Sequence, residues 1–254
     1  MRTGRLLVSL LLAVPLGISA SLPVHAQSER QPLLTRRDLY RTGAVLALTA
    51  ATMTLDRRIA RAVRGSRAQG VDALQEGSRT IKFVNERSLF AVSTGIYIVG
   101  RVSGRRPLAS FGLHAAEAIV LTAAAQTAIK GGAGRSRPFV TRNSDPFDFH
   151  PGLGFRDPAY RSLPSLHNGG SLAFASVLVS EVTHRNPGRA RFLAPITYSA
   201  GSLPGLGRMY VNKHWASDVV LGSAMGLGAG LFTARYHQLR PDNAIDRFAL
   251  GRRP

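Results

Sequence analysis

The stretch PLASFGLHAAEAIVLTAAAQTAIK, residues 107–130, decides the fold class, because it is predominantly apolar and has the length of a long helix. Gly131–Gly134 follows it directly and reads as a helix stop signal. Other segments have comparable helical patterns, and no strand-type alternation persists. Helices are predicted at residues 35–55, 79–102, 107–130, 170–184, 191–203 and 215–238. The sequence therefore predicts an all-α protein, a bundle of about six helices with a long loop at 131–163.

Local signals support two of these boundaries. Thr35 and Asp38 have the spacing of a capping box, which opens the first helix, and a short basic segment at 57–64 follows that helix. The loop at 131–163 is rich in glycine and carries phenylalanines among charged residues. Loops longer than about 12–15 residues in compact domains are usually functional or disordered. Its position between two motifs favours a functional loop.

Length and composition bound the class of protein. The 254 residues suit one domain, predicted at 27–254, and the absence of cysteine excludes disulfides, thiolate zinc sites and cysteine nucleophiles. The formal charge of +19 predicts attraction to phosphate-bearing partners. The arginines are scattered rather than grouped, so much of this charge is interpreted as solvated surface. A nucleic acid is not expected as a partner, whereas an anionic membrane surface is a possible one.

The first 26 residues are typical of a secretory signal. Arg2 and Arg5 form a basic start, Leu6–Leu16 an apolar centre, and Val24–Ala26 a small-residue cleavage site. Prolines and a glycine interrupt the stretch, which disfavours an uncleaved membrane anchor. We therefore expect cleavage after Ala26 and export to the periplasm.

Membrane spans need about 20 predominantly apolar residues. Residues 107–130 are long enough but carry His114, Glu117 and Gln126, and Val219–Thr233 is rich in glycine and only 15 residues long. The mean hydropathy of the chain is +0.01. Buried helices of a soluble bundle are the favoured interpretation, and membrane association of one or two helices stays open.

Three short segments combine the residue types that phosphate chemistry needs. They are KGGAGRSRP at 130–138, SLPSLH at 162–167 and GRMYVNKHWASD at 207–218. Arg137 and Arg208 can each offer a bidentate fork to a phosphate, and Lys130 offers a compact charge. Ser165 supplies a hydroxyl near the start of a predicted helix, where unpaired backbone N–H groups favour an anion. The convergence of these donors predicts a phosphate site.

Two histidines divide the predicted chemistry. His214 and Asp218 are four residues apart, so on a helical turn they share one face. An aspartate that accepts from one ring nitrogen leaves the other free to attack phosphorus, which gives a phosphohistidine. His167 would act as general acid toward the leaving oxygen and then as base for water. Taken singly, each motif has a plainer interpretation, such as a surface ion pair or a helix cap.

The three segments together resemble the type 2 phosphatidic acid phosphatase superfamily, whose signature is K-x6-R-P, then P-S-G-H, then S-R-x5-H-x3-D. Nine positions match with their gaps intact, and the resemblance spans about residues 107–235. It implies a metal-independent phosphoric ester hydrolase that uses no cofactor and acts on phosphomonoesters or lipid phosphates. It also implies catalytic roles for His214, His167 and Asp218. The phosphate-binding residues that it implies are Lys130, Arg137, Ser165, Leu166 and Arg208.

Two positions depart from this signature. Leu166 replaces a glycine, and Gly207 replaces a serine. The backbone N–H of Leu166 can still reach phosphate if its φ is negative, whereas its side chain narrows the pocket or contacts an apolar leaving group. A Pro-Ser-Leu-His variant also occurs in branches of the superfamily that transfer phosphorylated head groups. The departures therefore leave open the choice between hydrolase and transferase.

Four alternatives to an exported soluble phosphatase follow from the same residues. They are a membrane-associated lipid phosphatase, a head-group phosphotransferase, a vanadate-dependent haloperoxidase and a non-catalytic basic protein that binds anions. Other patterns are given plainer interpretations. A metal at Asp145, Asp148 and His150 is disfavoured, since that run reads as loop. The glycines at 226, 228 and 230 are expected to allow close helix packing, and Trp215 is expected to be a packing residue.

Overall fold

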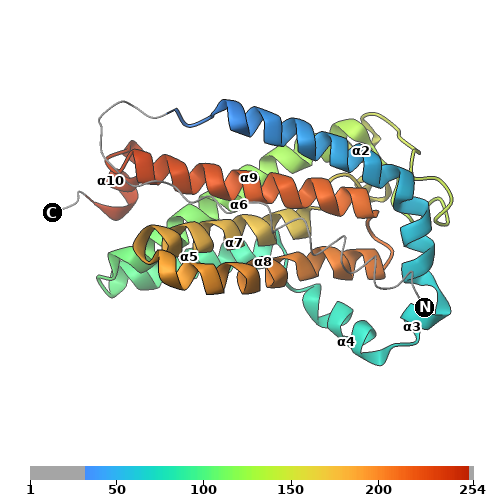
Figure 1. The fold of residues 1–254 in the computed structure, drawn as a ribbon, viewed down its shortest axis with the longest axis horizontal. Coiled ribbons are helices and arrows are strands. Elements are labelled where there is room, and N and C mark those ends of the chain that lie inside the picture. Colours follow the sequence, from blue (N-terminus) through green and yellow to red (C-terminus); the bar gives the residue numbers. More distant parts are fainter. Residues whose placement is uncertain (1–31, 252–254) are drawn as a thin grey trace.

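The computed structural model describes residues 32–251, which fold into long helices and short connections (Figure 1). The predicted secretory signal, residues 1–26, lies outside the described residues. No β-strand occurs between residues 32 and 251, so the all-α prediction is confirmed. The helices are α2 (Arg36–Arg64), α3 (Ser66–Gln69), α4 (Asp72–Ile81), α5 (Glu86–Val102), α6 (Arg106–Ala133), α7 (Leu166–Arg185), α8 (Pro187–Tyr210), α9 (Ala216–Leu239) and α10 (Ala244–Leu250), with two 3-10 turns, η1 (Leu153–Phe155) and η2 (Pro158–Tyr160).

Six long helices form the bundle, accompanied by the short helices α3, α4 and α10. The observed helices differ from the predicted ones in three places. The segment 57–64 is not separate but continues α2 to its end. The predicted helix at 79–102 is divided, because the Asn85 side chain accepts hydrogen bonds from the Arg87 and Ser88 N–H groups and starts α5 anew. The C-terminal α10 was not predicted, since it is only seven residues long.

A row of glycines lets α7 and α9 lie close together. A Cβ on Gly222 would lie 2.4 Å from the Ser165 carbonyl oxygen, and one on Gly226 would lie 2.0 Å from that of Gly169. Gly230 makes a similar approach to α7, whereas Gly228 faces open space, so the predicted packing role is confirmed for two glycines and wrong for Gly228. This contact aligns the two helix N-termini, where two of the three motifs lie.

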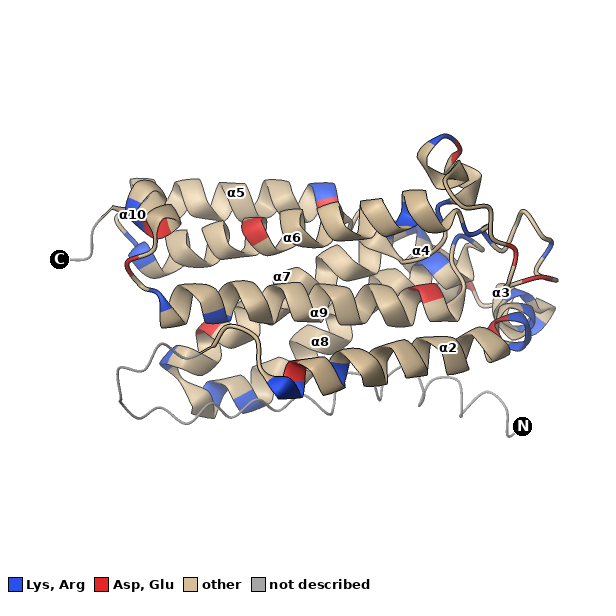
Figure 2. Cartoon of the chain, turned by 90° about the horizontal axis from the view of Figure 1, so that it is seen from above, with Lys and Arg blue, Asp and Glu red and all other residues tan. Residues whose placement is uncertain are grey.

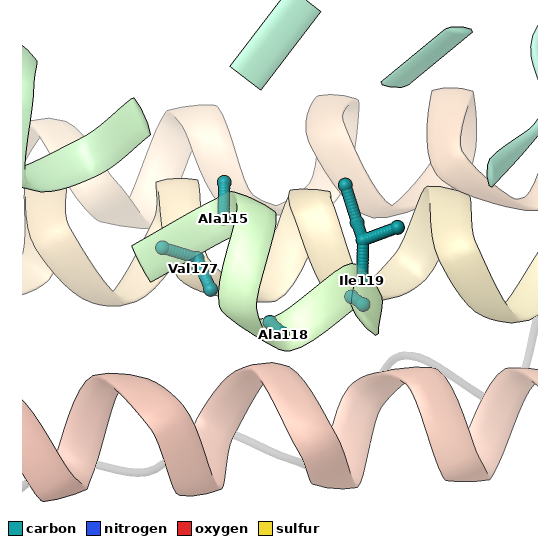
Figure 3. Packing of buried hydrophobic residues seen from close by; sticks show 5 residues of the cluster. Ala115, Ala118, Ile119 and Val177 are labelled. Carbon is teal, nitrogen blue, oxygen red and sulfur yellow. The ribbon is translucent and has the colours of Figure 1, made fainter. Parts of the chain in front are cut away.

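The apolar core between α6 and α7 is built from small and branched side chains. Ala115, Ala118 and Ile119 of α6 pack against Ala173 and Val177 of α7, and all five are at most 2% exposed (Figure 3). Alanine lets the two backbones approach closely. The core therefore holds the end of α6, with Lys130, at a fixed position relative to the start of α7.

The outer surface of the bundle is unusually apolar. Charged residues gather toward the two ends of the bundle, and the middle turns of the long helices are mostly uncharged (Figure 2). Large apolar side chains are exposed on several of these turns, among them Leu46, Ile98, Val120 and Ile196. Exposed apolar patches of this kind mark contacts with a partner or a membrane.

Two helices, α6 and α9, are long and apolar enough to cross a membrane. The helix predicted at 215–238 corresponds to α9, and the 15 residues at 219–233 were only its apolar stretch. An 18-residue part of α9 is nevertheless apolar enough to span a membrane. In α9, 61% of the most apolar stretch is buried within the protein, against 44% in α6, so α9 is also explained as a core helix. Two such helices are weak support for membrane association, which they permit without requiring it.

Candidate active site

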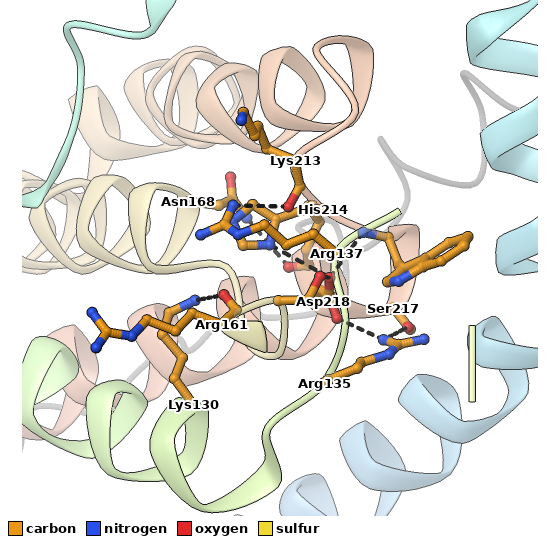
Figure 4. Close-up of polar contacts among 12 residues, drawn as sticks. Lys130, Arg135, Arg137, Arg161, Asn168, Lys213, His214, Ser217 and Asp218 are labelled. Atoms are coloured by element: carbon orange, nitrogen blue, oxygen red, sulfur yellow. Dashed lines mark hydrogen bonds and ion pairs between the residues drawn. The ribbon is translucent and has the colours of Figure 1, made fainter. Parts of the chain in front are cut away.

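The three motifs meet at one end of the bundle (Figure 4). Lys130 lies in the last turn of α6, and Arg208 lies in the last turn of α8. Ser165 is the N-cap of α7, with Leu166 and His167 in its first turn, and Arg137 comes from the loop at 131–163. His214 and Asp218 lie at the start of α9. The structure thus brings together every residue that the sequence predicted for the site.

The basic side chains are held by backbone carbonyls rather than by carboxylates. Lys130 Nζ donates to the Arg161 carbonyl at 2.9 Å, and the Arg137 guanidinium donates to the carbonyls of Pro158 and Lys213 at 2.9 and 3.0 Å. Lys213 directly precedes His214, so this last bond holds Arg137 beside the histidine (Figure 4). These bonds position the cations and leave their charge uncompensated, which suits an anionic ligand.

Two buried donors at this end, Ser165 Oγ and Arg208 Nε, have no hydrogen-bond partner. His214 Nδ1 and Glu86 Oε2 also make no regular hydrogen bond, but each lies 3.4 Å from an ion-pair partner. Buried polar atoms in proteins are hydrogen-bonded in the large majority of cases, so a group of unpaired ones needs an explanation. A bound phosphate would offer several acceptor oxygens to the serine hydroxyl and the guanidinium. The unpaired donors therefore support an anion site at the position that the motifs predicted.

His214 and Asp218 form a buried pair, but not in the way that the spacing suggested. Their Nδ1 and Oδ2 atoms are 3.4 Å apart. The two residues do not share a helical face, because α9 begins only at Ala216 and His214 precedes it. Asp218 instead turns back over the N-terminus and accepts a hydrogen bond from the Trp215 N–H at 2.8 Å. This capping bond directs the carboxylate toward the histidine ring.

A network that sequence reasoning missed holds the Asp218 carboxylate. Arg135, which is fully buried, donates to Asp218 Oδ1 at 2.6 Å and to Asp56 Oδ2 on α2 at 2.8 Å. The Ser162 hydroxyl donates to Asp218 Oδ2 at 2.5 Å. Arg135 and Ser162 lie within the quoted segments, which is the only sequence signal for them, and no role was predicted for either. Nothing in the sequence pointed to Asp56.

The pKa values of the two histidines are strongly lowered. Burial, with the nearby charges of Lys130 and Arg137, lowers the pKa of His214 to about 3, although Asp218 opposes the shift. Burial and the charges of Arg208, Lys130 and Arg137 lower the pKa of His167 to about 4. Both imidazoles are therefore neutral without substrate, which leaves a lone pair on His214 for attack.

The same surroundings act on the cations and on Asp218. Burial and the charge of Arg137 lower the pKa of Lys130 to about 7, and burial and Arg208 lower that of Arg137 to about 10. Burial alone would raise the pKa of Asp218, but Arg135 and His214 hold it well below its usual range. Asp218 stays ionised, and the cluster of cations repels itself until an anion binds.

Glu86 is a further side chain at the site that the sequence did not suggest. It lies in the first turn of α5, and its Oε2 atom is 3.4 Å from His167 Nδ1. That oxygen is buried and has no hydrogen bond of regular geometry. The contact orients the His167 ring by the same principle that Asp218 applies to His214.

The structure explains both departures from the family signature. Leu166 occupies the first position of α7, where φ is helical and its N–H points out of the helix terminus. A Cβ on Gly207 would lie 2.5 Å from Ile81 Cγ2 at the end of α4, so a serine there would require the Ile81 side chain to shift. Trp215 is 1% exposed, which confirms its packing role. Asp148 and His150 pair with each other in the loop, at 2.8 Å.

The comparisons agree with this geometry. A model of the PAP2 superfamily matches residues 111–242, just over half of the chain, and the chain belongs to that superfamily. A lipid A 1-phosphatase from Porphyromonas gingivalis is 35% identical over 72 residues, which are 28% of this chain and only 15% of that protein. No solved structure was found to match the chain. The sequence match thus shows the superfamily, and the all-α bundle agrees with it.

Proposed function

We propose that this protein hydrolyses phosphate monoesters, with lipid phosphates as the preferred class, through a phosphohistidine at His214. The observation that carries the proposal is the set of unpaired buried donors beside a buried histidine–aspartate pair. Lys130, Arg137 and Arg208 would hold three phosphate oxygens. Their charge matches the charge that spreads over those oxygens in the transition state. This arrangement can act without a metal or other cofactor.

In the first step, the free ring nitrogen of His214 attacks phosphorus while the bond from phosphorus to the ester oxygen breaks. Asp218 accepts from the other ring nitrogen and stabilises the charge that develops on the ring. The bound phosphate offsets the positive field of the three cations, which raises the pKa of His167 from its low value in the free enzyme. His167 then carries the proton that it gives to the leaving oxygen.

In the second step, neutral His167 takes a proton from water as the water oxygen attacks phosphorus. The phosphorus–nitrogen bond breaks, inorganic phosphate forms and His214 regains its lone pair. His167 releases its proton as phosphate leaves. The two histidines thus keep separate tasks, and Glu86 holds His167 in the orientation that both steps need.

Three observations favour a lipid phosphate over a small ester. Apolar side chains are exposed on the middle turns of the long helices, and Leu166 adds an apolar group at the start of α7. The partly matching relative is named for action on a lipid phosphate. An exported protein, associated with the membrane through these apolar faces, would meet such substrates at the lipid surface.

The test compares phosphate release from an aryl phosphate, from phosphatidic acid in vesicles, from lipid A and from polyprenyl pyrophosphate. We expect turnover of a lipid substrate to exceed that of the aryl phosphate, inhibition by vanadate and no loss of initial rate with a chelator. Rapid quenching with ³²P-labelled substrate should trap an acid-labile, alkali-stable phosphoenzyme. Absence of phosphate release from all four substrates would refute the proposal.

Head-group transfer is the second candidate, and Leu166 favours it because an apolar side chain beside the phosphoenzyme disfavours water. The same labelled substrate distinguishes the two reactions. A hydrolase releases label as inorganic phosphate even when glycerol or a second lipid alcohol is present. A transferase passes the label to the alcohol, and inorganic phosphate then falls in proportion.

A further inference from the structure

A second buried cluster of histidines and carboxylates lies at the opposite end of the bundle. His114 of α6 and His237 of α9 stack ring on ring, with centroids 3.8 Å apart and planes 19° from parallel. Asp246 of α10 lies beside both rings, and all three residues are at most 4% exposed. Along α6, His114 is 16 residues from Lys130, which is about 24 Å at 1.5 Å per residue. The phosphate chemistry therefore does not explain this cluster.

Three atoms of the cluster, which we call its inner atoms, lie close together: His114 Nε2, His237 Nδ1 and Asp246 Oδ1. Asp246 Oδ1 lies 3.3 Å from His114 Nε2 and 2.9 Å from His237 Nδ1. One ligand atom from each of the three residues lies within 4.8 Å of the other two. In a tetrahedral site with bonds of about 2.0–2.1 Å, ligand atoms are about 3.3 Å apart. Two of the three separations are thus close to this value, and the two ring nitrogens lie no more than 4.8 Å apart. A shared ion would require the stacked rings to turn toward it.

The outer atoms of the two rings contact carboxylates. His114 Nδ1 is 2.9 Å from Glu181 Oε1, and His237 Nε2 is 2.7 Å from Glu117 Oε2. Metal-binding histidines almost always donate their other N–H to a carboxylate or a carbonyl, which fixes the tautomer. With the protons on the outer nitrogens, the inner nitrogens direct their lone pairs toward Asp246.

Asn243 supports this tautomer. Its side-chain nitrogen, a donor only, lies 3.2 Å from His237 Nδ1, a contact that fits the tautomer in which this ring nitrogen accepts. A lone pair and a carboxylate oxygen 2.9 Å apart repel each other unless a proton or a cation lies between them. Protonation of both rings would stack two positive charges face to face. A cation that binds both nitrogens and the oxygen avoids both conflicts.

A divalent ion also fits the local charge. Glu117, Glu181 and Asp246 contribute three negative charges, and Arg185 offsets one of them through a 2.8 Å contact to Glu181. Histidines that bind a metal are neutral, so the ion would balance the two negative charges that remain. Two imidazoles and a carboxylate are ligands typical of zinc and related first-row metals.

We propose that His114, His237 and Asp246 bind a divalent transition-metal ion, with Zn²⁺ as the chemical match, that fastens α10 to α6 and α9. The ion would be structural, with water completing its coordination. The seven-residue α10 is otherwise attached chiefly by bonds to its C-terminal carbonyls, such as the one from Arg101 to the Leu250 carbonyl at 2.8 Å. Metal binding would stabilise the folded state because the unfolded chain lacks the preformed site.

The test uses the mature chain, first stripped with a chelator and then titrated with Co²⁺ and Zn²⁺. We expect one Co²⁺ per chain with the visible absorption of a four-coordinate site, displacement by Zn²⁺, and a higher Tm with Zn²⁺ than with chelator. Asp246→Asn keeps the shape but removes the anionic ligand, and should weaken Zn²⁺ binding at least about tenfold. The matched control is Asp148→Asn, which alters the other aspartate–histidine pair, in the loop, and should leave the titration unchanged.

Two results would overturn the proposal. One is a wild-type chain with neither cobalt absorption nor a rise in Tm with Zn²⁺. The other is Zn²⁺ binding that persists unchanged in Asp246→Asn. If that variant does not fold, the wild-type titration and the variant His114→Asn decide the question. None of these measurements depends on phosphatase activity, so failure of the proposed function would not affect them.

Discussion

The two ends of the bundle hold the same kinds of residue with opposite electrostatics. At the active-site end, burial and two cations, Lys130 and Arg137, lower the pKa of His214 to about 3. At the other end, burial also lowers the pKa of His114, but hydrogen bonds to Asp246 and Glu181 outweigh it and raise the pKa to about 9. The sign of the surrounding charge, and not burial, therefore decides whether a buried histidine serves as a nucleophile or as a partner of carboxylates.

The ends also differ in how completely their polar atoms are paired. Near the phosphate site, Ser165 Oγ and Arg208 Nε are buried donors without a hydrogen-bond partner. At the other end, both nitrogens of His114 and of His237 face a carboxylate. Unpaired donors favour the binding of an anionic ligand at the first end. At the other end the two histidines lie among three carboxylates, which suits a structural role.

Replacing one histidine at each end by asparagine gives the largest expected effects. His214→Asn should lower kcat by about 10³-fold or more, because it removes the nucleophile, and leave unfolding nearly unchanged. His237→Asn should keep kcat but lower the free energy of unfolding by about 3 kcal/mol, since Glu117 loses its histidine partner and Asp246 keeps only His114. Initial rates measure the change in kcat of both variants, and urea unfolding measures the change in their free energy of unfolding. Equal losses of activity in the two variants would remove the distinction between the ends.

Arg135 is the exception at the active-site end, because it is fully paired with Asp56 and Asp218. Arg135→Met should lower the free energy of unfolding by about 3–5 kcal/mol, since two buried carboxylates lose their counter-charge. Adding Asp56→Asn should restore part of the stability but not the activity, because Asp218 still lacks its partner. Denaturant unfolding of the single and double variants gives the coupling free energy between Arg135 and Asp56. A double variant that is no more stable than Arg135→Met would contradict this account.

The lowered pKa of Lys130 predicts the pH dependence. Lys130 is charged below about pH 7 and loses its charge above it, so anion binding and kcat/KM should fall as the pH rises through this range. Lys130→Arg keeps the charge, and the alkaline fall should move upward by more than about one pH unit, since arginine remains protonated there. Profiles of kcat/KM for both enzymes check this. Superimposable alkaline limbs would assign the fall to another group.

Glu86→Gln tests whether His167 is positioned by its carboxylate neighbour. We expect kcat to fall about tenfold with KM little changed, because orientation of the general acid matters more in the transition state than in binding. Glu86→Asp should recover part of the rate. The exposed Glu76→Gln on α4 serves as the control. A larger change in KM than in kcat would indicate a role in substrate binding instead.

Leu166→Gly restores the family residue and should have the smallest effect. We expect the ratio of kcat/KM for phosphatidic acid to that for an aryl phosphate to fall severalfold, because about one apolar contact to the lipid is lost. Partition of label between water and an added alcohol should shift toward water in the same variant. If both ratios stay constant, the Leu166 side chain does not contact the leaving group.

Much of the site could be predicted because its constraints are local along the chain. The gaps between Lys130 and Arg137, and between Arg208, His214 and Asp218, are short and tied to helix ends. The all-α class likewise follows from periodicity, which each helix carries in its own residues. Boundaries were less certain, as the division at Asn85 illustrates, since a side-chain cap interrupts an otherwise continuous pattern.

Only the tertiary structure decided which distant groups act on these residues. Arg135 and Asp56 are 79 positions apart, and Asp56 and Ser217 are 161 apart, so no spacing rule connects them. The same holds for Glu86 beside His167, and for the α10 aspartate that faces two histidines at the far end. The sequence by itself determined which residues are the candidates to bind and transfer phosphate. Packing decided the charge around each histidine, because electrostatic fields depend on distance in space and not on position in the chain.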